Sequence, residues 1–119
     1  WFMCLWNHRD LSDPIQGEIE NIIRNALPEY GYGARREDQT GIIIDTGLFS
    51  NIKEFSGTVT HKQTISECID AWRSHATLMR QSGPEFVSII RNISSFLQTL
   101  EEPMIKIPYK TIGWAAQKI

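Results

Sequence analysis

The sequence is poor in cysteine, has no excess of basic charge and has no long apolar run. Cys4 and Cys68 form no CxxC pair, which excludes a disulfide framework, and we expect two buried thiols in a reduced, cytoplasmic protein. Twelve Lys and Arg residues against fourteen Asp and Glu residues give a formal charge of −2, so we do not expect a nucleic-acid partner. No apolar run approaches the roughly 20 residues that span a bilayer, so we expect no membrane partner either.

The common catalytic and cofactor motifs are also missing. The chain contains no GxGxxG, no P-loop, no HExxH and no nucleophile elbow. Its three histidines, His8, His61 and His75, are not spaced like a local metal site, so we expect no metal. Function therefore has to be inferred from the organisation of the chain and from its polar clusters.

What is present is the composition of a folded domain. The 119 residues are 41% hydrophobic and 22% charged, which is typical of one globular domain. We therefore expect residues 1–119 to form a single α/β domain. The chain opens on Trp1 in an apolar run and has no initiator methionine. We expect this domain to be a fragment of a larger one whose upstream chain has been removed.

The first half of the chain reads as a strand, a helix and a loop. Residues 1–7 form a continuous apolar run, the pattern of a strand covered on both faces. Asp13 and Pro14 then form a helix start, and Pro28 ends that helix. Residues 28–40 predict a polar surface loop. Residues 41–49 predict a short helix, although their three consecutive isoleucines fit a strand equally well.

The second half alternates between strand and helix patterns. Residues 52–62 alternate with period two, which predicts a strand with one solvated face. Thr64 and Glu67 form a capping box, which opens a helix whose inner face runs on to Met79. A second helix starts near residue 82 and ends before Pro103. Residues 104–119 predict one strand or two short strands joined at a bend, and Pro108 favours an edge or bulge position.

Two polar groups are the first candidates for binding. Asn7, His8, Arg9 and Asp10 leave the carboxyl end of the first strand, where ligands bind in open parallel sheets. The alternative is that Asp10 only shapes the turn into the next helix. Residues Arg35 and Arg36 could bind a carboxylate through paired hydrogen bonds, or they could be a solvated surface pair.

Three segments together resemble a known family. They are Trp-Asn-His-Arg-Asp at residues 6–10, Arg-Ser-His at 73–75 and Ile-Pro-Tyr-Lys-Thr at 107–111. As a set they resemble class I S-adenosylmethionine-dependent methyltransferases, and among them the small-molecule enzymes similar to trans-aconitate methyltransferase. The resemblance covers nearly all of this chain but only the carboxyl-terminal half of such an enzyme. It implies an α/β, Rossmann-like sheet of which this chain supplies the fifth to seventh strands, ending in an antiparallel pair, with a helical cap.

The resemblance also implies a function and a set of candidate residues. The function is the acceptor-binding portion of an enzyme that methylates a small molecule. The glycine-rich loop that binds S-adenosylmethionine would precede Trp1, so we expect this chain alone to bind that cofactor poorly and to be inactive. The residues placed to bind the acceptor are Asn7, His8, Arg9, Tyr30, Tyr32, Arg35, Arg36, Trp72, Arg73 and His75.

A second hypothesis belongs to a different class. The chain could be a stand-alone, non-catalytic α/β or α+β module that binds a ligand or pairs with itself. A sheet that lacks its partner strands exposes unpaired edges, and such edges favour a homodimer.

Overall fold

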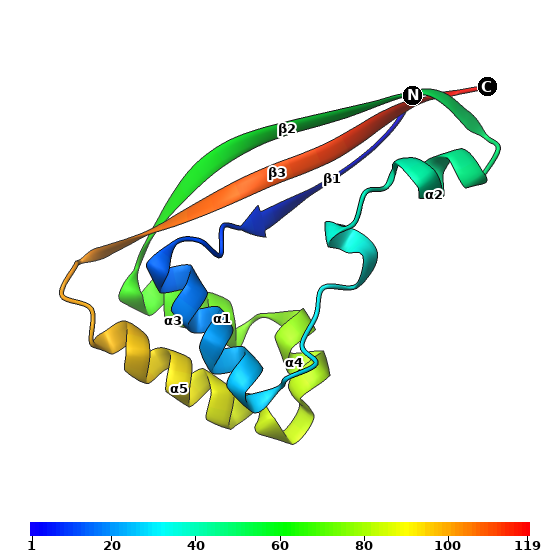
Figure 1. Ribbon diagram of the computed structural model, residues 1–119. Helices are drawn as coiled ribbons and strands as arrows, with labels where there is room; N and C mark the ends of the chain where they lie inside the picture. The colour runs from blue at the N-terminus through cyan, green and yellow to red at the C-terminus, as the bar shows by residue number, and fades with distance from the viewer. The chain divides into compact units, whose positions relative to one another are not determined.

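A computed structural model describes all 119 residues, and its α/β class agrees with the sequence prediction (Figure 1). Its three strands and five α-helices are joined by short connections, two of which hold 3-10 turns. In chain order the elements are β1 (Phe2–Arg9), α1 (Pro14–Ala26), η1 (Gly33–Arg36), α2 (Thr40–Asp45), β2 (Phe49–Thr64), α3 (Ile65–Arg73), α4 (Ala76–Ser82), η2 (Gly83–Glu85), α5 (Phe86–Gln98) and β3 (Met104–Lys118).

Internal contacts divide the chain into two compact units. The sheet unit contains Trp1–Arg9, Tyr32–Val59 and Pro108–Ile119, and the helical unit contains Asp10–Gly31 and Thr60–Ile107. Strands β2 and β3 contribute residues to both units. Whether the two units fold together as the single expected domain stays a prediction.

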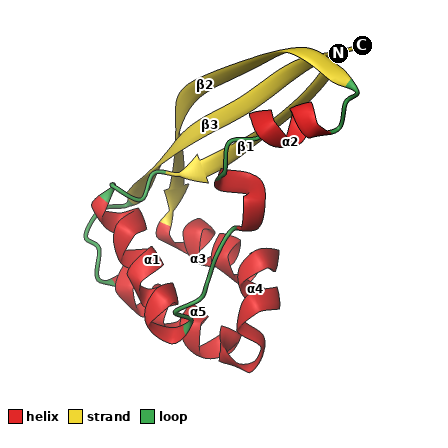
Figure 2. Cartoon of the chain, turned by 45° about the vertical axis from the view of Figure 1, so that its right-hand side comes forward, coloured by secondary structure: helices red, strands yellow, loops and turns green.

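The three strands form one sheet in the order β1-β3-β2, so the last strand lies between the first two (Figure 2). β1 and β3 are antiparallel and pair from Phe2 opposite Ala116 to Arg9 opposite Tyr109. β1 has no partner on its other side and is an edge strand of this sheet.

The expectation that both faces of the first strand are covered is wrong. Met3 is 59% exposed and Leu5 is 48% exposed, whereas Cys4 and Trp6, which alternate with them, are partly buried. The physical reason is the period of two along a strand: only one face of β1 meets the core of the sheet unit. Cys4 is therefore half-buried rather than buried, while Cys68 is buried as expected.

The core of the sheet unit lies on that covered face. Ile43, Trp114 and Ala116 are buried there, and partly buried apolar side chains from β1, β2 and β3 surround them. The rings of Trp6 and Trp114 meet edge to face with their centroids 6.2 Å apart. Ile43 comes from α2, so the helix alternative holds at 40–45, while Phe49 already begins β2.

The prediction that Pro108 lies on an edge strand or at a bulge is wrong. β3 is one continuous strand and is central in the sheet. However, the pairing between β1 and β3 ends at Tyr109, so Pro108 lies just beyond the end of β1. The missing N–H of Pro108 therefore costs no hydrogen bond to β1.

The helical unit is built on amphipathic helices. The Asp13 carboxylate accepts hydrogen bonds from the N–H groups of Ile15 and Gln16, as the sequence predicts for the start of α1. α5 contacts α1, α3 and α4, and its residues Ile89, Ile93 and Leu97 form much of the core. None of the helices is both long enough and apolar enough to cross a membrane.

The helix that opens at the capping box is shorter than predicted. The reciprocal bonds between Thr64 and Glu67 are present, but α3 ends at Arg73, and α4 starts at Ala76. His75 lies between them in an extended conformation, and its Nδ1 accepts a hydrogen bond from the N–H of Leu78 at 3.1 Å. The break rotates the second segment, so Leu78 is buried and the predicted core residue Met79 is 49% exposed.

Gly113 tests how tightly the sheet is packed. The aromatic ring of Phe55 covers Gly113 on the open face, and a Cβ atom at this position would collide with that ring and touch Leu5. Gly113→Ala should therefore push the half-exposed ring of Phe55 aside and lower the free energy of unfolding by about 1 kcal/mol in chemical denaturation, the low end of the cost of overpacking. In a Phe55→Ala background, where the ring is gone, the same substitution should cost much less.

Gly57 provides the matched control, because it lies in β2 and a Cβ atom added there would have no neighbour within 4 Å. Gly57→Ala should change stability by no more than about 0.5 kcal/mol. Equal losses for Gly113→Ala in both backgrounds would show that the ring of Phe55 is not the cause.

Candidate functional site

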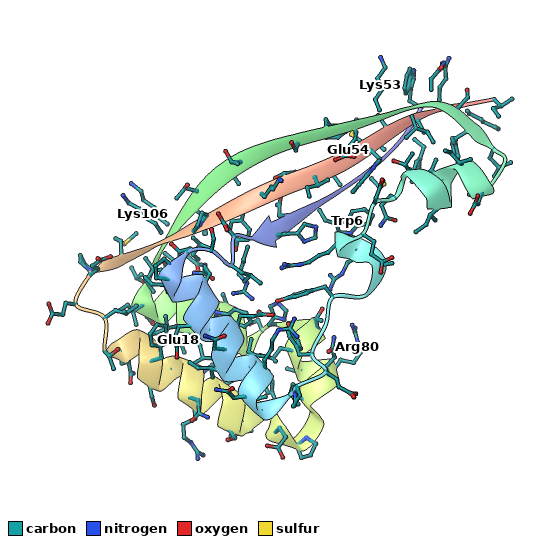
Figure 3. All side chains as sticks on the ribbon, viewed as in Figure 1. Trp6, Glu18, Lys53, Glu54, Arg80 and Lys106 are labelled. Atoms are coloured by element: carbon teal, nitrogen blue, oxygen red, sulfur yellow. The ribbon has the colours of Figure 1, made fainter.

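Six of the ten predicted residues lie in the sheet unit, and five of these six gather at the carboxyl end of β1 and in or beside η1. We name His8, Arg9, Tyr32, Arg35 and Arg36 the Tyr32 cluster, because its three arginines all contact Tyr32. Trp6, two residues before His8 on β1, is labelled in Figure 3 and marks this strand.

The local sequence holds the η1 segment in shape. Gly33 has a φ of +62°, a backbone conformation that side chains disfavour and glycine adopts at little cost. The buried amide of Gln39 donates hydrogen bonds to the carbonyls of Ala34 at 2.6 Å and Glu37 at 2.9 Å. Because these bonds close the turn around Arg35 and Arg36, both arginines project from a fixed backbone.

Tyr32 contacts the guanidinium groups of three arginines. The Arg36 guanidinium carbon lies 3.8 Å from the centre of the Tyr32 ring, a cation–π contact. Arg9 Nη2 donates to the Tyr32 hydroxyl at 3.3 Å, and Arg35 Nε donates to the Tyr32 carbonyl at 3.1 Å. One aromatic residue therefore holds three positive charges at one end of β1.

Neither of the two carboxylates that directly follow the arginines, Glu37 and Asp38, pairs with them, and Asp38 is engaged elsewhere. Arg35 and Arg36 form no ion pair. Asp38 follows them closely, but its carboxylate accepts a hydrogen bond from the N–H of Thr40 at 2.8 Å, at the start of α2. Hydrogen bonds from the hydroxyl and the N–H of Thr40 lower the pKa of Asp38. The positive charge of the cluster is thus not neutralised by this residue.

His8 is electrically coupled to the same cluster. Burial lowers the pKa of His8 below 6.5, the charges of Arg36 and Arg35 lower it further, and a hydrogen bond to the Arg35 backbone partly opposes them. His8 Nε2 is buried and has no hydrogen-bond partner. At neutral pH His8 is therefore an uncharged imidazole with one unused ring nitrogen.

The other predicted residues have separate surroundings. Asn7 is part of the sheet unit, but its Oδ1 accepts a hydrogen bond from the Thr111 hydroxyl at 2.6 Å across the β1–β3 pair. Tyr30, Trp72, Arg73 and His75 belong to the helical unit. Whether they share a ligand with the Tyr32 cluster stays a prediction.

Within the helical unit, these four residues have defined local roles. The buried Trp72 ring stacks on the His75 ring with centroids 4.9 Å apart, and His75 also caps α4. Arg73 forms an exposed ion pair with Asp70 at 3.1 Å. Tyr30 is buried beside Gly31, whose N–H and carbonyl both bond to the side chain of Gln81.

Sequence reasoning missed the residue that orders the cluster, Gln39. A buried glutamine within a polar loop carries no motif, so only the structure identifies it. A partial signal was present in Asp38 and Thr40, because an aspartate two residues before a helix residue is a common helix start. No three His, Cys, Asp or Glu side chains lie together as metal ligands, so we assign no residue to a metal site.

Comparison of the chain with protein-family models and with curated proteins found no match. Function is therefore inferred from the geometry described above and from the sequence resemblance.

The ionisation of His8 tests its coupling to the arginines. Arg36→Gln should raise the pKa of His8, because it removes the largest charge effect that opposes protonation. The ring-proton NMR signals of His8, followed from pH 4 to 8, measure the shift directly. Lys118→Gln removes an equal charge within the sheet unit, eight residues along β3 from Lys110, which lies opposite His8, and should leave the pKa of His8 unchanged. An unchanged pKa in Arg36→Gln would contradict the coupling.

The lowered pKa also predicts how stability depends on pH. Between the folded pKa of His8 and 6.5, the unfolded chain binds more protons than the folded one, so stability falls as the pH is lowered through this window. His8→Asn should make the free energy of unfolding less dependent on pH in that window. Denaturation at a series of pH values from 8 to 5 measures this dependence. His61→Asn, at an exposed position, is the control. Asp38 affects the free energy of unfolding only at lower pH, because its lowered pKa stabilises the fold above the ordinary carboxyl pKa of 3.8 and this stabilisation is lost below it.

Proposed function

We propose that this chain is the carboxyl-terminal, acceptor-binding portion of an S-adenosylmethionine-dependent methyltransferase that acts on a small molecule. The observation that carries the proposal is β1, which has the composition of an inner strand but lies at the edge of the sheet. The direction of the closing strand and the charge of the Tyr32 cluster add support.

β1 is an unprotected edge. Edge strands are normally shielded by charged residues, proline or a bulge, and Phe2–Trp6 in β1 contains no charged residue and no proline. Its residues Phe2, Met3 and Leu5 are exposed apolar side chains. These features fit a strand that pairs with a further strand of a larger sheet, as the resemblance implies for the fifth strand of a methyltransferase.

The end of the chain supports the same proposal. The resemblance implies a closing antiparallel strand pair that contains the Ile-Pro-Tyr-Lys-Thr segment. β3 holds this segment at residues 107–111 and is hydrogen-bonded to β2 as well as to β1. The antiparallel direction of β3 relative to β1 also agrees with a sheet whose last strand reverses.

The residues of this chain do not form an S-adenosylmethionine site. No glycine-rich turn follows β1, and N–H groups at the start of α1 are already bonded to the carboxylate of Asp13. The backbone amides that recognise the cofactor would have to come from residues before Trp1. We therefore assign only acceptor binding to this chain and derive no methyl-transfer step from it.

The Tyr32 cluster is the best acceptor site in the sheet unit. It lies at the carboxyl end of β1, and its arginines offer N–H donors to an anionic group. A direct methyl transfer needs little more from the protein than a fixed acceptor and the exclusion of water. A positioning site without a nucleophile is consistent with that requirement.

The second candidate function is a stand-alone module that forms a homodimer through β1. The same exposed apolar side chains on an unpaired edge support it, because two copies could pair these edges. The two candidates differ in what lies next to β1: a strand of the same polypeptide or a second copy. The cytoplasmic location stays a prediction under both.

The coding sequence upstream of the Trp1 codon tests the proposal. We expect an open reading frame of about 130 residues with a glycine-rich turn after its first strand, because a complete cofactor site needs that element. The longer protein should bind S-adenosylhomocysteine in calorimetry, whereas the 119-residue chain should not. A start codon within a few residues of Trp1, together with a dimer in light scattering, would favour the second candidate instead.

A further inference from the structure

We propose that Arg35, Arg36 and His8 form an oxyanion site that binds a small carboxylate or phosphate group. The site is part of this chain alone, and only its description as the place of the acceptor rests on the proposed function. The chemical class of the ligand follows from the charges and donors at the site rather than from the fold.

The electrostatics of the Tyr32 cluster favour an anion. Three guanidinium groups contact one tyrosine, and neither Arg35 nor Arg36 has a carboxylate partner. Like charges held together repel each other, and a bound anion removes this repulsion. The chain as a whole has a formal charge of −2, so this positive group is a local feature and not a consequence of composition.

Both arginines keep hydrogen-bond donors for a ligand. Arg36 contacts Tyr32 through the face of its guanidinium, and that contact leaves the N–H groups at the edge of the guanidinium unused. Arg35 uses Nε to bond the Tyr32 carbonyl, so its two terminal amino groups remain for another partner. Paired N–H groups of this kind match the two oxygens of a carboxylate or phosphate.

His8 adds a buried donor that depends on the anion. Its Nε2 is a buried polar atom without a partner, next to the arginines whose charges act on it. The other charged groups near it along the chain and in the sheet are Arg9 and Lys110, which are cations, and Asp10, whose carboxylate accepts hydrogen bonds from Ser12. Glu37 directly follows Arg36 and pairs with neither arginine. The charges that act on His8 are those of Arg36 and Arg35, so a proton on Nε2 is disfavoured until an anion arrives. A bound anion then makes His8 a charged hydrogen-bond donor.

The backbone around the site is fixed before any ligand binds. The bonds of Gln39 and the conformation of Gly33 hold the η1 turn, and Tyr32 holds the arginine side chains. An ordinary solvated arginine pair lacks such supports. Preorganised donors lose less conformational entropy on binding, which favours a specific site over a diffuse positive surface.

The experiment uses the 119-residue chain and two probes, malonate and inorganic phosphate, with neutral malonamide as the blank. By linkage, an anion that binds next to His8 must raise the pKa of His8, and binding must strengthen as the pH falls. NMR titration of His8 with each probe at constant ionic strength should show this rise. A larger effect of malonate identifies a carboxylate site, and a larger effect of phosphate identifies a phosphate site.

Variants separate a specific site from general positive charge. Arg36→Gln and Arg35→Gln should each weaken binding about tenfold or more, the effect of losing a charged hydrogen bond. Lys118→Gln, which removes one charge at the far end of β3 within the same unit, should bind as the parent does. The circular dichroism of each variant confirms that it is folded, and two independent arginine variants keep the test decisive if one of them fails to fold.

Two outcomes would overturn the inference. One is that neither anion shifts the titration of His8 more than malonamide does. The other is that Lys118→Gln weakens binding as much as Arg36→Gln does. Neither outcome bears on the upstream sequence or on S-adenosylhomocysteine binding, so a failure here is distinct from a failure of the proposed function.

Discussion

The sheet of this protein depends on the position of its last strand. β1 and β2 are not hydrogen-bonded to each other, so they share a sheet only because β3 lies between them. β3 also supplies Trp114 and Ala116, two of the three buried residues at the centre of the sheet unit. Because the strand that joins the sheet is the last to be synthesised, the contacts that stabilise β1 span almost the whole chain, and such contacts cost loop entropy to form.

One consequence of this arrangement is the exposed edge of β1. The sheet gives β1 hydrogen bonds on one side and core contacts on one face. Its apolar sequence is suited to contacts on both faces, and the exposed side chains of Met3 and Leu5 are the part left uncovered. Burying an apolar side chain of this size is worth about 1.5–3 kcal/mol. A further layer of structure, from the same polypeptide or from a second copy, would therefore gain free energy by covering this open face.

The Tyr32 cluster is a part of the protein whose charges work against the stability of the folded state. Gathering positive charges around one tyrosine costs electrostatic free energy, which the cation–π contact and the hydrogen bonds to Tyr32 oppose. A turn fixed by Gln39 maintains the arrangement. Such a local conflict with the rules of stability is what a ligand-binding site is expected to show.

The sequence by itself determined the elements whose signals are local. The caps at Asp13 and Thr64 and the period-two pattern of β2 act between neighbouring residues, so they are readable without a fold. Only the tertiary structure decided that β3 is central, that β1 is half exposed and that His75 separates two helices. It also decided that three arginines meet at Tyr32. These outcomes depend on which segments, far apart in the sequence, pack against one another, and a local sequence pattern does not contain that information.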